Sequence, residues 1–121
     1  MGTTHEFTLI ADADFTDKLG CAVVVKAQLV HKTPVGTLAT AEKAIDGIVT
    51  DVTADGKAGA PLAVAKVGDI AYAKIGADGV TVGDELVVGT EGRLIKAGTG
   101  VAVAKALATG AENELIPVLI K

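Results

Sequence analysis

Aromatic side chains are scarce in this chain of 121 residues, which has no tryptophan, one tyrosine and two phenylalanines. Half of the residues are hydrophobic, and most of these are alanine and valine. Small side chains gain less free energy from burial than leucine or phenylalanine does. A core of this kind predicts a domain that is stabilised further by oligomerisation or by docking on a larger partner.

The chain has a single cysteine, Cys21, and no serine. One cysteine excludes an internal disulfide, which is typical of a protein that folds in a reducing cytoplasm. Cys21 begins a strongly apolar stretch, so we expect a buried structural thiol rather than a nucleophile. The absence of serine also excludes a Gly-x-Ser-x-Gly nucleophile motif.

Basic clusters and long apolar runs are missing as well. The formal net charge is −4, and without a basic cluster we expect no binding to nucleic acid. Lys or Asp interrupts each apolar run before it reaches the roughly 20 residues of a membrane span, so no membrane segment is predicted. Residues 1–6 lack the basic and apolar regions of a secretory signal.

No pattern of chemically reactive residues predicts catalysis. The two histidines stand apart, and no His, Cys or carboxylate spacing resembles a metal or cofactor site. The pairs Asp12/Asp14 and Asp84/Glu85 could in principle act as acid and base. Both pairs lie in loop-like segments, so we interpret them as solvated surface charge. The sequence therefore predicts no enzyme activity, no cofactor and no metal.

Short apolar, β-branched segments alternate with turns that contain many of the 15 glycines. This pattern predicts an all-β fold, a small β-barrel or β-sandwich of short strands with at most one or two short helical turns. The expected strands are Phe7–Ile10, Cys21–His31 with room for a bulge, Ile48–Val52, Pro61–Lys66, Ile70–Ile75, Glu85–Val88, Arg93–Lys96, Val101–Leu107 and Leu115–Ile120. In Ile70–Ile75 the alternation places Ile70, Tyr72 and Lys74 on one face and Ala71, Ala73 and Ile75 on the other.

The segment 80–96 has the pattern of a β-hairpin. Gly83 and Asp84 form a turn that leads into the apolar strand Glu85–Val88. The connection Gly89–Gly92 begins and ends with a glycine, a residue that tolerates positive φ, and Arg93–Lys96 is the return strand.

One helical turn is predicted, at Leu38–Ala44. Thr33–Gly36 is expected to end the preceding strand because it contains proline and glycine. Thr40 can then cap a run of good helix formers, and Asp46 and Gly47 stop it.

Three blocks of residues follow one another in the last two thirds of the chain. They are Asp46–Val49 with Ala58–Ala65, Val82–Leu86 with Thr90–Ala97, and Gly100–Ala106 leading to Ile116–Ile120. In order and spacing, these blocks resemble the bacteriophage capsid cement, or head-decoration, proteins, a family of small β-barrels. Residues 1–37 are not matched.

The resemblance implies a structural virion protein. Such proteins bind the outer surface of an expanded phage head as trimers, where shell subunits meet around local three-fold axes, and clamp the shell against internal DNA pressure. It implies the major capsid protein as partner, a homotrimer, assembly in the bacterial host cytoplasm and a final location on the capsid exterior. Three linked contacts raise the effective concentration, so each single contact can be small.

Under this resemblance, residues 1–15 are expected to be a flexible N-terminal arm and residues 16–121 the β-barrel decoration domain. The segment Thr3–Ile10 could add a strand to a capsid sheet edge, or it could be the first strand of the barrel. Phe7 and Phe15 could anchor an interface, as aromatic residues often do, or they could fill the core. The candidate capsid-binding residues are Thr3, Thr4, His5, Glu6, Phe7, Thr8, Leu9, Ile10 and Phe15.

Two other functions stay open at this point. Ala41–Ala44 resembles the lysine hairpin of a lipoyl- or biotinyl-like carrier domain. However, Lys43 lies only four residues before Gly47, too close for the strand that should separate them. A trimeric phage tail or fibre module would also be β-rich and inert, and the sequence separates it poorly from a cement protein.

Overall fold

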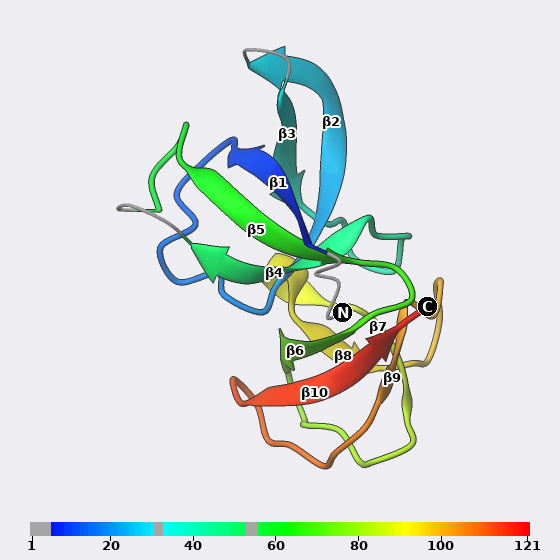
Figure 1. The fold of residues 1–121 in the computed structure, drawn as a ribbon. Helices are drawn as coiled ribbons and strands as arrows, with labels where there is room; N and C mark the ends of the chain where they lie inside the picture. Colours follow the sequence, from blue (N-terminus) through cyan, green and yellow to red (C-terminus); the bar gives the residue numbers. More distant parts are fainter. Residues whose placement is uncertain (1–5, 31–32, 53–55) are drawn as a thin grey trace, which may run out of the picture.

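The structure, a computed structural model, describes residues 6–30, 33–52 and 56–121 as ten short strands and one 3-10 turn (Figure 1). In chain order the elements are β1 (Glu6–Ala11), β2 (Ala22–Val30), β3 (Thr33–Leu38), β4 (Gly47–Val52), β5 (Pro61–Lys66), β6 (Ile70–Lys74), β7 (Glu85–Val88), η1 (Thr90–Gly92), β8 (Leu94–Lys96), β9 (Ala104–Ala106) and β10 (Leu115–Ile120). The predicted all-β class, with at most one or two short helical turns, is confirmed.

The first half of the chain forms a closed five-stranded barrel with the strand order β1-β3-β2-β4-β5. It closes because β1 pairs on both sides, in parallel with β3 and antiparallel with β5. The register of these pairs places Ile10 beside Val35 and Leu9 beside Leu62. The buried core of the barrel consists of Leu9, Ala11, Phe15, Val23, Val49, Leu62 and Val64.

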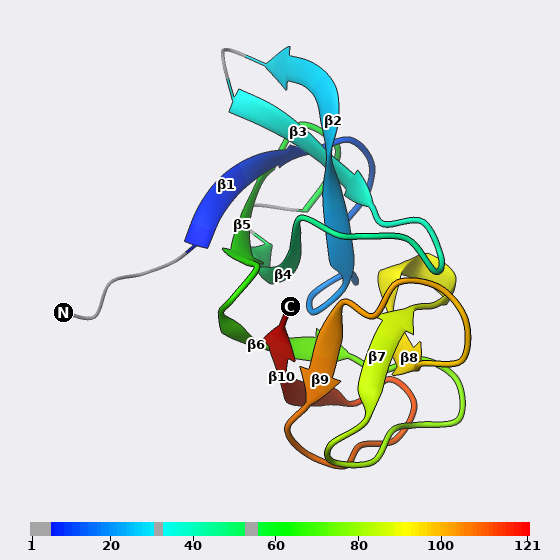
Figure 2. The same ribbon diagram turned by 90° about the vertical axis from the view of Figure 1, so that its right-hand side faces the viewer.

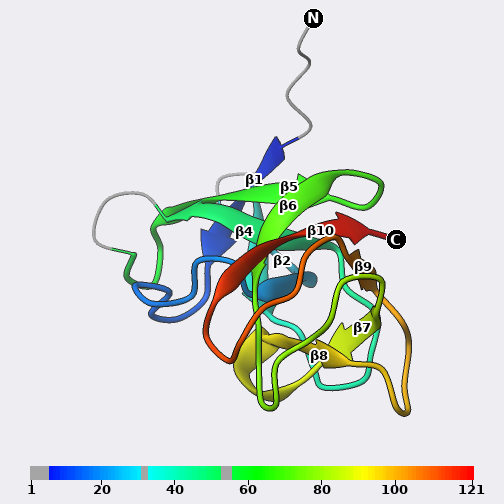
Figure 3. The ribbon, with the colours of Figure 1, turned by 90° about the horizontal axis from the view of Figure 1, so that it is seen from below.

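The second half forms a five-stranded sheet with the order β6-β10-β9-β7-β8, which is visible along the sheet in Figure 3. Its inner face is buried against the start of the barrel strands, in a cluster that includes Ala22 and Ile48 from the barrel and Ile75, Leu86 and Val118 from the sheet. The predicted alternation of β6 is confirmed, because Ala71, Ala73 and Ile75 are buried whereas Ile70 and Tyr72 are exposed.

Gly20 joins the barrel to the sheet. Its N–H donates to the Val49 carbonyl in β4 at 2.9 Å, and its carbonyl accepts the Lys74 N–H of β6 at 2.8 Å. Its φ of +84° is a conformation that residues with a Cβ rarely adopt. A Cβ at this position would also stand 2.5 Å from Leu115 Cδ2 and 2.8 Å from Lys74 N.

The strand β3 is missing from the prediction, which ended a strand at Thr33–Gly36. The structure pairs β3 with β2 as a hairpin that projects from the barrel (Figures 1 and 2). β1 pairs with Val35 and Gly36 of β3. Pro34 precedes these residues and pairs with Leu29 of β2, so the N–H that proline lacks removes no hydrogen bond to β1. The bulge allowed for in the second strand lies between Val25 and Leu29, where the register shifts.

The predicted helical turn at Leu38–Ala44 is wrong. Leu38 ends β3, and residues 39–46 are a loop in which Glu42 has a φ of 65°. The Glu42 N–H donates to the Val88 carbonyl, and the Glu42 carbonyl accepts the Val101 N–H, both at 2.9 Å. These long-range hydrogen bonds hold Glu42 outside a helix, and the local bond from the Lys43 N–H to the Thr40 carbonyl, at 3.2 Å, closes a turn.

The predicted hairpin at 80–96 is confirmed, with β7 and β8 paired antiparallel. Its connection differs in detail from the prediction, because the left-handed residues are Glu91 and Gly92 rather than the two glycines. Gly89 has a φ of −108°. Position 92 also has no room for a side chain, since a Cβ there would stand 2.9 Å from the Ala22 carbonyl oxygen of β2.

We expect the substitution Gly20→Ala to lower the free energy of unfolding by about 3 kcal/mol or more, because it adds both backbone strain and a clash. The matched control is Gly59→Ala, where φ is +92° but no atom lies within 4 Å of the new Cβ. Strain alone should cost the control about 1–2 kcal/mol. Urea unfolding of both variants measures the difference, and equal losses would contradict the role given to Gly20.

Candidate functional site

The segment predicted to contact a capsid begins at Thr3, and its described part starts at Glu6. Glu6–Ile10 pair with Ala65–Pro61 of β5, so this structure has the first barrel strand rather than a free arm at these residues. Thr3, Thr4 and His5 lie outside the described residues, as do residues 1 and 2. The described part of the predicted arm, residues 6–15, thus belongs to the barrel and to the loop after β1.

Side chains of β1 alternate between the core and the surface, as a strand requires. Leu9 and Phe15 are buried in the barrel core, and Phe7 is half-buried against it. Thr8 is exposed and Ile10 is half-buried. Of the predicted contact residues, Leu9 and Phe15 are therefore inaccessible to a partner while the barrel is folded, whereas the Thr8 side chain is accessible.

The acidic loop after β1 is held together by its own carboxylates. Asp14 Oδ1 accepts the Thr16 N–H at 2.9 Å and the Thr16 hydroxyl, and Asp14 Oδ2 lies 3.1 Å from Lys57 Nζ. These contacts, led by the Thr16 hydroxyl, lower the pKa of Asp14 to about 2. Asp12 lies 3.6 Å from Lys26 Nζ. Both carboxylates have structural partners on the surface, in keeping with the solvated charge that we predicted for them.

Cys21 is buried and forms no disulfide, as predicted. Burial raises the pKa of its thiol, which keeps it protonated and unreactive. It adjoins a polar hollow of about 260 Å³. Charges around this hollow are paired: Lys18 Nζ lies 3.3 Å from Asp17 and 3.5 Å from Glu91, and Arg93 lies 3.3 Å from a Glu112 oxygen. A third cation of the hollow, Lys74, donates through Nζ to the Asp17 carbonyl at 3.2 Å.

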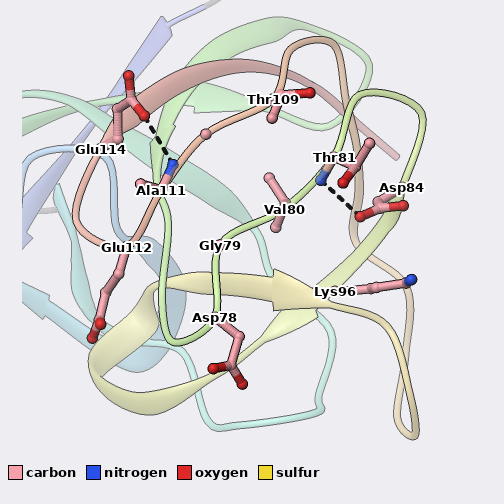
Figure 4. A pocket seen from close by; sticks show the side chains of 11 residues that line it. Asp78, Gly79, Val80, Thr81, Asp84, Lys96, Thr109, Ala111, Glu112 and Glu114 are labelled. Atoms are coloured by element: carbon pink, nitrogen blue, oxygen red, sulfur yellow. Dashed lines mark hydrogen bonds between the residues drawn. The ribbon is translucent and has the colours of Figure 1, made fainter.

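A larger open groove of about 750 Å³ lies between the loops that connect β6 to β7 and β9 to β10 (Figure 4). The two loops bind each other through paired hydrogen bonds between Val80 and Gly110, at 2.8 and 3.0 Å. The groove is acidic, and its charged lining residues are Asp78, Asp84, Glu112, Glu114 and Lys96.

Two of the groove's carboxylates stabilise the turns around them. Asp84 Oδ2 accepts the Thr81 N–H at 2.9 Å, and Glu114 Oε1 accepts the Ala111 N–H at 2.8 Å (Figure 4). Within the described part of the chain, no three His, Cys, Asp or Glu side chains are placed to hold a metal ion. Nor do the described ranges contain a helix long and apolar enough to cross a membrane.

Lys43, the candidate for a carrier-domain lysine, is exposed in the loop between β3 and β4. These strands do not pair with each other, because β2 lies between them in the barrel. Lys43 is therefore not at the tip of a two-stranded hairpin, which is the geometry that the resemblance to a carrier domain required.

No protein-family model matches the sequence, and no curated protein matches it. Among solved structures, the N base of the head fibre gp8.5 of bacteriophage phi29 is similar, with a TM-score of 0.74. The two chains share a fold. The match covers 96% of this chain and 92% of the phage chain, at 15% sequence identity. The barrel and the sheet are both included in a match of this extent.

We expect the pKa of the Asp14 carboxyl to be about 2 in the folded protein, and to rise in Thr16→Val while staying below the usual 3.8, because the backbone N–H of residue 16 and Lys57 still stabilise the charged form. Because the folded pKa is depressed, the contribution of this group to stability is present above about pH 4 and is lost as the pH falls through 2. Carboxyl NMR titration of the wild type and Thr16→Val measures the shift, with Thr40→Val as control. A midpoint near pH 2 in Thr16→Val would contradict this assignment.

Proposed function

We propose that this protein is a structural component of a phage head, which binds the outer surface of the expanded capsid and stabilises it as a cement or decoration trimer. One observation carries the proposal. The fold of nearly the whole chain is similar to that of a phage head fibre base, with a TM-score of 0.74. The resemblance of Asp46–Ile120 to head-decoration proteins rests on sequence and points to the same kind of particle.

The surface chemistry supports a binding role rather than catalysis. The carboxylates that could have served as acid and base, Asp14 and Asp84, are engaged by Thr16, Lys57 and Thr81. The thiol of Cys21 is buried. We propose accordingly that the protein is not an enzyme and acts without a cofactor.

The proposed partner is the major capsid protein, contacted on the capsid exterior after assembly in the host cytoplasm. Thr3–Thr8 and Ile10 remain predicted contacts, and the side chain of Thr8 is exposed. A trimer multiplies a small contact, because the second and third contacts form at high effective concentration. The same residues could therefore hold the shell firmly even if one copy binds weakly.

A second candidate function follows from the words that describe the similar structure, the base of a head fibre. A fibre base also binds the outside of a head, but it need not stabilise the shell. The two roles differ in what they do to the capsid, so a stability measurement on decorated heads separates them.

We expect the purified protein to sediment with expanded heads of the parent phage and not with unexpanded heads. The physical reason is that expansion creates the three-fold sites which the proposed trimer fits. Quantifying bound protein after centrifugation through a sucrose cushion measures this. Equal binding to both kinds of head, or binding to neither, would contradict the cement role.

Bound protein should also raise the temperature at which expanded heads lose their DNA, measured by fluorescence of a DNA-binding dye. A protein that binds the intact shell but not the opened one stabilises the intact shell by its binding free energy. Expanded heads without the added protein are the control. Binding without any rise in that temperature would favour the fibre base over the cement protein.

A further inference from the structure

The outer face of β6 and β10 is apolar and exposed. In the antiparallel register, Ile70 lies beside Leu119 and Tyr72 beside Pro117, so their side chains share the outer face. Leu115 and Leu19 extend it at one end, where they line a hollow of about 220 Å³ together with Ile70 and Tyr72. We call these six residues the apolar face: Leu19, Ile70, Tyr72, Leu115, Pro117 and Leu119.

Four residues of this face are exposed, whereas Pro117 and Leu119 are half-buried. Ile70 is 64% exposed and Tyr72 62%, and Leu19 and Leu115 are about two fifths exposed. Tyr72 is the chain's one tyrosine. Because tyrosine is enriched among residues that dominate binding energy, its position here favours an interface over chance exposure.

The area of the apolar face can be compared with what an interface needs. At about 200 Å² for each fully exposed large side chain, the printed exposures of Leu19, Ile70, Tyr72 and Leu115 add up to about 400 Å². The largest apolar patch on a typical soluble monomer is about 300–600 Å² and is often functional, and a standard interface buries about 800 Å² per partner. The apolar face thus supplies about half of one side of an interface before any polar rim is counted.

The polar surroundings of the face favour a second copy of this chain as the partner. Lys74 lies beside Leu115 and Lys105 beside Leu119, so lysines border the apolar face on two strands. Glu85, on the far side of Lys105, is ion-paired with Lys121. The groove that contains Asp78, Asp84 and Glu114 supplies the opposite charge on a different surface of the same chain. Unlike charges on two surfaces of one chain suit a head-to-tail contact, and head-to-tail contacts can close into a ring.

We propose that the apolar face is one side of the contact between copies of this protein, with the acidic groove of the neighbouring copy at its lysine border. The proposal rests on the trimer of the proposed function and names the surface that forms it. Tyr72 and Ile70 are the central residues, since they expose the most area and line the hollow.

The test compares two double variants. Ile70→Thr with Tyr72→Thr removes the centre of the face and leaves residues with high β-propensity at both positions of β6. Val25→Thr with Val101→Thr is the matched control, because these valines are 41% and 49% exposed but lie outside both the apolar face and the acidic groove. Thermal unfolding followed by circular dichroism verifies that both variants fold. Sedimentation velocity over a range of concentrations, with native mass spectrometry, gives the oligomeric state.

We expect a wild-type trimer, a control that associates like the wild type, and at least a tenfold weaker association for Ile70→Thr with Tyr72→Thr. A folded Ile70→Thr/Tyr72→Thr protein that associates like the wild type would overturn the proposal. So would a wild type that is monomeric at every concentration.

Binding to heads separates this proposal from the proposed function. A wild-type monomer that still sediments with expanded heads would leave the head-binding role standing and overturn the interface. A trimer that the Ile70→Thr/Tyr72→Thr variant disrupts, but that never binds heads, would support the interface and contradict the cement role.

Discussion

The structure depends on the two backbone hydrogen bonds of Gly20, one to β4 of the barrel and one to β6 of the sheet. Both units are small, and their cores consist mainly of alanine, valine, isoleucine and leucine, so neither buries much area alone. Gly20 brings their backbones close enough for Ala22 and Ile48 of the barrel to share a core with Ile75 and Leu86 of the sheet. A side chain at this position would separate the two units.

The close approach of barrel and sheet at Gly20 also determines which face of the sheet remains exposed. With the inner face of the sheet covered by the barrel, the outer face of β6 and β10 has no covering layer among the described residues. A chain that is poor in aromatic residues thus keeps its one tyrosine at the surface. The chain shares its fold with the base of a phage head fibre, and the contact between copies that we propose covers this face.

Local pattern predicted the elements that short-range physics controls. The bounds of β5 and β10 agree with the prediction, since alternation and flanking turn residues define each strand. β3 was missed because Pro34 and Gly36 are typical of a turn, and because its parallel partner β1 is separated from it in the sequence by the whole of β2. The helical turn expected at Leu38–Ala44 is not formed, for a related reason. The backbone of Glu42 makes hydrogen bonds to Val88 and Val101, which are distant in sequence.

For the candidate site, the sequence determined which residues were apolar or aromatic but not which of them the fold would expose. Phe15 and Leu9, predicted as contacts, fill the barrel core, whereas Ile70 and Tyr72, predicted only as one side of a strand, form the apolar face. Alternation tells which side chains share a side of a strand, and it does so from the sequence alone. Which side is covered depends on the order of strands and on the junction at Gly20, and these contacts join residues too distant in sequence for any local pattern to encode.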